Sequence, residues 1–150
     1  MNADLRGQLA PTVARARMLA GNATVTVVGA STRFTFKVQA SDPEPGRAPM
    51  HFVKVLTGSD NESDFQYLGT IDARGEYRHG RKSKIAPSAP SALAFAWLWR
   101  NLPRAESEGA FPHGAQLWHE GRCCRCGRKL SVPESVAEGL GPDCAERAAA

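Results

Sequence analysis

All four cysteines of this 150-residue chain lie between positions 123 and 144, and their spacing is typical of a metal site. Two residues separate Cys123 from Cys126, the spacing with which a tight turn presents two thiolates to one zinc ion. Gly127 follows directly, and a glycine can adopt the positive φ that lets backbone N–H groups face sulfur. This segment therefore predicts a zinc knuckle.

Cys144 is the predicted third ligand because of the helix on which it should stand. Ser131 and Glu134 have the spacing of a capping box, which opens a short helix that Gly139 can end. Pro142 suits the first position of a second helix. Cys144 then lies in the first turn of that helix, where the helix dipole favours a thiolate. A knuckle combined with a ligand at a helix N-terminus is the outline of a treble clef.

The fourth ligand is predicted to be His119, because a closed structural zinc site has four ligands. His119 stands shortly before Cys123 and follows Trp118, whose ring could anchor it. Cys124, His113 and a water molecule are alternatives, although Cys124 should point away from an ion bound by its neighbour Cys123. The predicted cofactor is Zn²⁺, with the ligands Cys123, Cys126, Cys144 and His119.

Residues 116–150 form a unit that is too small to bury enough apolar surface by itself. A structural zinc ion contributes on the order of 10–16 kcal/mol on binding, so we expect the ion rather than packing to hold this unit together. Two alternatives for the extra cysteine are a buried apolar thiol at Cys124 and a redox pair of Cys123 with Cys124, although vicinal disulfides are strained.

The basic residues are clustered, although the net charge is only +4. Residues 74–84 and 122–129 are rich in Arg and Lys, which is what a surface that binds a polyanion needs. Two solvated loops would give the same pattern. The predicted nucleic-acid interface comprises Arg33, Lys37, Arg74, Tyr77, Arg78, Arg81, Lys82, Lys84, Arg122, Arg125, Arg128 and Lys129.

Aromatic side chains near these basic residues could stack on unpaired bases. Tyr67, Tyr77 and Trp118 are the candidates, and Tyr77, between Glu76 and Arg78, is the one predicted to be exposed. The other aromatic residues of the predicted strands and helix are assigned to the core, namely Phe34, Phe36, Trp97 and Trp99. The leading hypothesis is thus a protein that binds DNA or RNA.

A second hypothesis is a protein-binding module that inhibits a host defence or nuclease complex, of the anti-CRISPR kind. The stretch 42–64 is acidic and could mimic phosphate in a partner's nucleic-acid channel, while the basic segments could meet an acidic partner. A structural role in a virion is a third hypothesis. The sequence does not determine the oligomeric state.

The sequence predicts no enzyme. It contains no P-loop, GxSxG, HExxH or paired-carboxylate motif, and the acidic stretch 60–64 lacks the twelve-residue pattern of a calcium loop. Two catalytic alternatives are a Cys124 nucleophile with His119 as base, and an open zinc site with Glu120 as base.

The elements that would position these residues predict an α+β fold. We expect an antiparallel sheet of about five strands with flanking helices, plus the small treble-clef-like zinc unit. Pro11 would kink the N-terminal helix or mark its true start. The predicted elements are a helix at 4–20, strands at 24–27, 33–39, 51–58, 65–72 and 76–85, and an apolar helix at 91–102. The predicted domains are residues 1–102, a linker at 103–115 and the zinc unit at 116–150.

The location is predicted to be cytoplasmic, in the cytoplasm of a host cell. No apolar run reaches the length of a membrane span, and the N-terminal stretch MNADLRGQLA lacks the apolar region of a secretory signal. Thiols stay reduced in the cytosol, so disulfides are the less favoured use of the cysteines.

The motif CxxCGRxLxxPESxxxGxGPxC resembles the signature of a family of uncharacterised bacteriophage and prophage proteins, a domain of unknown function. The resemblance extends upstream through residues 51–71, 81–85, 94–100 and 118–123. It implies a phage or prophage origin and a zinc-type C-terminal unit, but no activity. The matching residues are Cys123, Cys126, Gly127, Arg128, Leu130, Pro133, Glu134, Ser135, Gly139, Gly141, Pro142 and Cys144.

Overall fold

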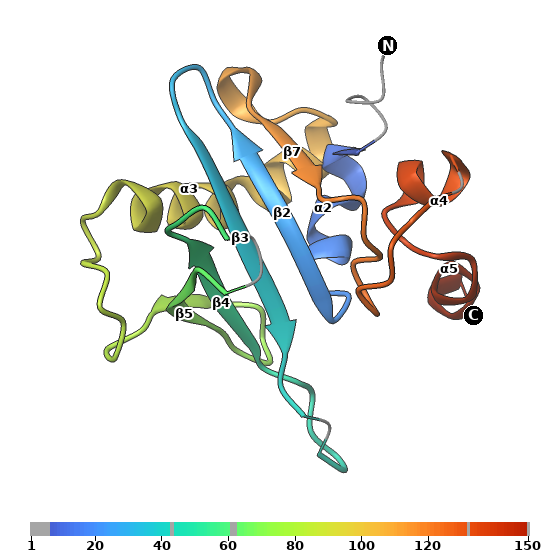
Figure 1. Ribbon diagram of the computed structural model, residues 1–150, viewed down its shortest axis with the longest axis horizontal. Helices are drawn as coiled ribbons and strands as arrows, with labels where there is room; N and C mark the ends of the chain where they lie inside the picture. Colours follow the sequence, from blue (N-terminus) through green and yellow to red (C-terminus); the bar gives the residue numbers. More distant parts are fainter. Residues whose placement is uncertain (1–6, 43, 61–62, 132, 150) are drawn as a thin grey trace.

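The computed structural model describes residues 7–42, 44–60, 63–131 and 133–149. It contains a seven-stranded antiparallel sheet with the strand order β1-β7-β2-β3-β4-β5-β6, together with four α-helices in the described part of the chain (Figure 1). The predicted α+β class and antiparallel sheet are therefore confirmed, with seven strands rather than five. Residues 4–6 of the predicted N-terminal helix lie outside the described residues.

The centre of the sheet follows the alternation of apolar and polar residues in the sequence. In β3, buried Phe36 and Val38 alternate with Thr35, Lys37 and Gln39, so one face of the strand meets the core and the other meets solvent. The five predicted strands are all present, and the fifth is shorter than predicted. They are β2 (Asn22–Val28), β3 (Arg33–Ala40), β4 (His51–Leu56), β5 (Phe65–Ile71) and β6 (Tyr77–His79).

Two further strands join the sheet at the β2 side. β7 (Gln116–His119) pairs with β2, and β1 (Gln8–Leu9) pairs with β7. Residues 116–119, which we predicted to begin the C-terminal unit, are therefore part of the sheet. A run of two or four residues is too short to show strand periodicity, so their pairing depends on tertiary contacts.

The helices α2 and α3 cover the same face of the sheet and lie behind it in Figure 1. α2 (Pro11–Met18) begins at Pro11, the position that the sequence offered as the true helix start. α3 (Pro90–Glu108) continues through Pro103, so the first residues of the predicted linker are helical. Its buried side chains Leu102 and Ala105 flank Pro103, and packing of the helix against α2 outweighs the hydrogen bond lost at the proline.

The core lies between this helix pair and the sheet. Phe95 of α3 is fully buried, and its ring centroid lies 5.0 Å from that of Phe36 and 4.7 Å from that of Tyr77. No described helix covers the opposite face (Figure 1). This uncovered face includes the side chains of Asn22, Thr24, Thr26, Arg33, Thr35, Lys37, Gln39, Phe52, Lys54, Tyr67, Thr70, Arg78 and Trp118.

His51 should make the stability of the fold depend on pH. Its ring is buried, and Nε2 lies 3.2 Å from the Leu19 carbonyl oxygen. Burial lowers the pKa of His51 below its ordinary value of 6.5, while the hydrogen bond to Leu19 opposes this shift. The unfolded chain then binds the proton more tightly. The stabilisation is complete above about pH 6.5 and is lost as the pH falls toward the lower folded pKa.

As the pH falls from about 8 to 5, we expect the free energy of unfolding to decrease less for His51→Gln than for the wild type. The difference between the two proteins can reach about 1.4 kcal/mol for each pH unit in the window between the two pKa values. Urea denaturation at a series of pH values measures it. Parallel curves for the two proteins would contradict the assignment.

Candidate metal centre

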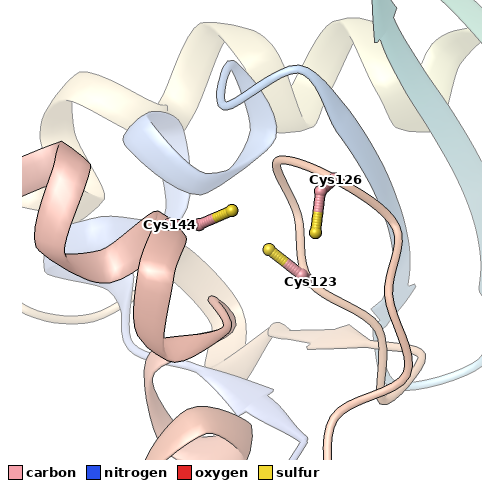
Figure 2. Close-up of side chains that lie close together, drawn as sticks. All are labelled: Cys123, Cys126 and Cys144. Carbon is pink, nitrogen blue, oxygen red and sulfur yellow. The ribbon is translucent and has the colours of Figure 1, made fainter.

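Three cysteine sulfurs converge in the C-terminal part of the structure (Figure 2). Cys123 and Cys126 project from one loop, and Cys144 projects from the first turn of α5 (Pro142–Ala149). The three sulfur atoms all lie within 4.8 Å of one another. Cys123 and Cys144 are buried, whereas Cys126 is exposed. This cysteine cluster could therefore hold a metal ion, as its spacing predicted.

The loop of residues 122–129, here called the knuckle, has the hydrogen bonds of a tight turn. The Gly127 N–H donates to the Cys123 carbonyl oxygen at 2.8 Å, and the Cys123 N–H donates to the Arg128 carbonyl oxygen at 2.8 Å. Gly127 has a φ of 79°, which glycine adopts without the steric cost that a β-carbon brings. The chain therefore reverses after Cys126, and the two sulfurs point toward one another (Figure 2).

The knuckle is attached to the sheet by backbone hydrogen bonds. The Asn22 N–H, at the start of β2, donates to the Cys124 carbonyl oxygen at 2.8 Å. The Cys124 N–H donates at 2.8 Å to the carbonyl oxygen of Gly139, just after α4 (Pro133–Glu138). Pro142 then begins α5, as predicted, and Cys144 lies in its first turn. The cluster is thus positioned by β2 and two short helices together.

Hydrogen bonds favour a thiolate on one of the three sulfurs. Burial alone would raise the pKa of the Cys123 thiol. Backbone N–H groups of Gly141, Cys126 and Arg125 donate to its sulfur, and they lower this pKa to about 7. Burial and hydrogen bonds with the Cys123 and Cys126 sulfurs raise the pKa of Cys144. A cation is the partner that stabilises the thiolate form of all three cysteines.

His119 does not join the cluster, in contrast to the prediction that it is the fourth ligand. Its ring is buried, Nδ1 accepts a hydrogen bond from the Gly121 N–H at 2.9 Å, and Nε2 donates to the Val136 carbonyl oxygen. Burial lowers the pKa of His119, which agrees with a neutral ring whose nitrogens are both occupied. Because β7 pairs with β2, the ring lies between β7 and α4 and connects them.

The two other side chains considered as ligands are also outside the cluster. Cys124 is buried, and burial together with the nearby Cys123 raises its pKa to about 12. A thiol with this pKa stays protonated at neutral pH, which fits a buried apolar side chain and argues against a Cys124 nucleophile. His113 is exposed in the turn at 112–114.

The C-terminal residues also pack against the rest of the molecule, although we expected the ion rather than packing to hold them together. Leu130, Leu140 and Cys124 belong to the same buried cluster as the sheet and helices. Arg17 of α2 forms an ion pair with Glu138 at 3.0 Å. An ion would therefore add to packing rather than replace it, because β7 draws this part of the chain onto the sheet.

The predicted basic residues are distributed over four regions. Arg33 and Lys37 lie on the uncovered face, and Arg78 of β6 lies at its far edge. Arg74 lies in the β5–β6 turn, 4.0 Å from Glu76. The remaining residues are exposed, in the turn after β6 (Arg81, Lys82 and Lys84) and on the knuckle (Arg122, Arg125, Arg128 and Lys129).

Tyr77 is not an exposed ring, contrary to the prediction. Its side chain packs against Phe95, its hydroxyl oxygen is buried, and burial raises its pKa to about 12. The reason is the alternation of β6, which turns Tyr77 toward α3 and Arg78 toward the uncovered face.

Two lysines lie directly opposite each other on the uncovered face, and only Lys37 was predicted to belong to the nucleic-acid interface. Lys37 of β3 pairs in register with Lys54 of β4. The Lys37 Nζ atom lies 4.4 Å from the centroid of the Phe65 ring. No described carboxylate forms an ion pair with either lysine. Lys54 could have been found from the HFVKVL alternation, but its pairing with Lys37 required the register.

The knuckle adjoins the uncovered face. A β-carbon at Gly127 would lie 2.8 Å from the side-chain nitrogen of Asn22, which shows how closely the loop approaches this strand. Asn22 in turn accepts a hydrogen bond from the Gln39 side chain at 3.5 Å. The basic residues of the knuckle therefore border the same surface as Lys37 and Lys54.

Residues 118–149 match the model of a family of unknown function (DUF6011). The match covers the end of β7, the knuckle, α4 and α5, so this segment is similar to an uncharacterised family, as the motif indicated. No curated protein and no solved structure matches the chain. None of the helices in the described residues is long and apolar enough to cross a membrane.

Metal content should depend on Cys144 and not on His119. We expect Cys144→Ser to lose most of its metal and His119→Gln to retain about one equivalent, because only Cys144 lies in the cluster. Elemental analysis of proteins purified without chelators measures this. Cys124→Ala is the matched cysteine control and should keep its metal despite some loss of stability. A metal-free His119→Gln variant that is still folded would restore His119 as a ligand.

Proposed function

We propose that the cysteine cluster binds a structural zinc ion. Three sulfur donors around one point suit Zn²⁺, which takes thiolate ligands in tetrahedral geometry. The ion would join the knuckle to α5, two segments that are linked in the chain only through α4. Zinc bound there would hold the arginines of the knuckle beside the uncovered face.

We infer that the protein binds nucleic acid through the uncovered face and the adjoining knuckle. The observation that supports this most directly is the cross-strand pair Lys37 and Lys54. Like charges directly opposite each other destabilise a sheet, and no described carboxylate compensates them. A phosphate backbone along this face would supply the missing negative charge and would release its counterions on binding.

Aromatic side chains on the same face favour the binding of single-stranded over double-stranded nucleic acid. Phe52 is 40% exposed, although it belongs to a central strand, and it lies opposite Gln39 and Thr70. Trp118 of β7 lies on the same face near the other edge of the sheet. It is partly exposed and stands opposite Thr26. An exposed ring on a basic sheet can stack on an unpaired base, which a duplex keeps inside its own stack. Phe52, and not Tyr77 as predicted, is therefore the exposed ring that could stack on a base.

The acidic residues of the stretch 42–64, which were predicted to mimic phosphate in a partner's channel, lie on both ends of β4. Asp42 and Glu44 precede β4, whereas Asp60 and Asp64 follow it. A six-residue strand separates the two groups by about 20 Å, so they lie at opposite ends of β4. Glu62 lies outside the described residues. Binding of an acidic segment of a host protein to the basic surface stays as the alternative.

The lysine pair should determine affinity and its salt dependence. We expect Lys37→Gln combined with Lys54→Gln to weaken binding to single-stranded DNA or RNA. The slope of log K against log salt should become shallower by about 1.4 for two lost phosphate contacts. Fluorescence anisotropy at several salt concentrations measures both. The matched control is Arg100→Gln with Arg104→Gln, which removes the same charge from exposed positions of α3 on the covered side.

Equal effects of the two double variants would show that only net charge matters. Undetectable binding of the wild-type protein to single and double strands would contradict the proposal. A single host protein that copurifies after nuclease digestion, and whose binding requires both lysines, would favour the alternative.

Phe52 should contribute by stacking rather than by charge. We expect Phe52→Ala to weaken binding to a single strand by about 1–3 kcal/mol, with little effect on the salt slope and on duplex binding. The same titrations measure this. Leu93→Ala is the control, because Leu93 is an exposed apolar residue on α3 at the covered side. An unchanged affinity of Phe52→Ala would remove stacking from the proposal.

A further inference from the structure

We propose that the metal ion in the cysteine cluster keeps one exchangeable coordination position, which faces a cationic pocket and accepts a small anion. This inference rests on the proposed zinc site and is independent of nucleic-acid binding. Among the described residues, three sulfurs lie within reach of one ion, whereas tetrahedral Zn²⁺ has four ligands.

The nearby side chains that could complete the set are engaged elsewhere. Both ring nitrogens of His119 are hydrogen-bonded to backbone groups, to the Gly121 N–H and the Val136 carbonyl. Cys124 is buried and is not among the three clustered sulfurs. The fourth ligand is therefore expected to come from outside this set of side chains.

A pocket of about 270 Å³ lies directly beside the cluster. Cys126 and Cys144 line it, whereas Cys123 does not and is fully buried. An ion held by the three sulfurs would consequently direct its remaining position toward the pocket. The volume is large enough for a water molecule or a small ligand.

The lining of the pocket selects for negative charge. Arg128, Lys129 and Arg147 contribute to its wall, against one carboxylate from Asp143. Zn²⁺ with three thiolates has a net charge of about −1, which these cations offset. They leave the pocket favourable for a small anionic donor that replaces water on the ion.

Asp143 is the internal competitor for this position. It lies next to Cys144 in the first turn of α5, and it lines the same pocket. Its carboxylate is not among the atoms within 4.8 Å of one another that form the cluster. An open position requires that Asp143 stay off the ion, so the test must include Asp143→Asn.

The test uses the whole 150-residue chain loaded with Co²⁺ in place of zinc, without nucleic acid. Thiolate-to-cobalt absorption reports that the cluster binds metal, and the visible d–d bands report the remaining ligand. We expect azide, a small anion, and imidazole, a neutral donor, to change the d–d bands at saturation while the thiolate absorption persists. Arg128→Gln with Arg147→Gln should weaken azide binding by about two- to fivefold for each charge removed. Imidazole affinity should stay unchanged.

Arg125→Gln is the control, because Arg125 is exposed on the knuckle and does not line the pocket. If neither azide nor imidazole changes the d–d bands of the wild type, the open position is overturned but the metal site is not. If azide and imidazole change the d–d bands only in Asp143→Asn, Asp143 is the fourth ligand, and the open position is again overturned. A protein without thiolate-to-cobalt absorption would overturn the metal proposal and this inference together.

Discussion

The pairing of β7 with β2 is the contact on which the rest of the C-terminal structure depends. It joins residues 116–119 to residues 25–28 in antiparallel register, so the chain leaves β7 toward the start of β2. The knuckle follows at that point, and the hydrogen bond from Asn22 to Cys124 extends the contact beyond the strand. Without this pairing, the cysteines would belong to a separate appendage rather than to one side of the sheet.

The same pairing changes the energetic role of the metal. A free unit of this size would depend on its ion, because it has few apolar side chains. Here Leu130 and Leu140 are buried with the main core, and Arg17 connects α2 to Glu138. The ion would then mainly hold the knuckle and α5 in a fixed relation. The distances between the three sulfurs are set by the hydrogen bonds of the knuckle and by the first turn of α5, and not by the ion.

The uncovered face stays open to solvent because α2 and α3 both pack on the other side of the sheet. β3 and β4 each alternate apolar and polar residues, and the register between them places Lys37 opposite Lys54. A sequence shows which residues of one strand share a face, but not which residues of two strands are neighbours. For the same reason the exposed ring is Phe52, whereas Tyr77, with charged neighbours in the chain, is covered by α3.

By itself, the sequence determined those features that are written in local patterns. These are the five alternating strands, the start of α2 at Pro11, the knuckle with its glycine, and the position of Cys144 in the first turn of α5. The tertiary structure decided which residues meet. It placed β7 within the sheet, occupied both nitrogens of His119, continued α3 through Pro103 and paired the two lysines. Each of these depends on packing between segments far apart in the chain, which outweighs local propensity and has no signal in a short stretch of residues.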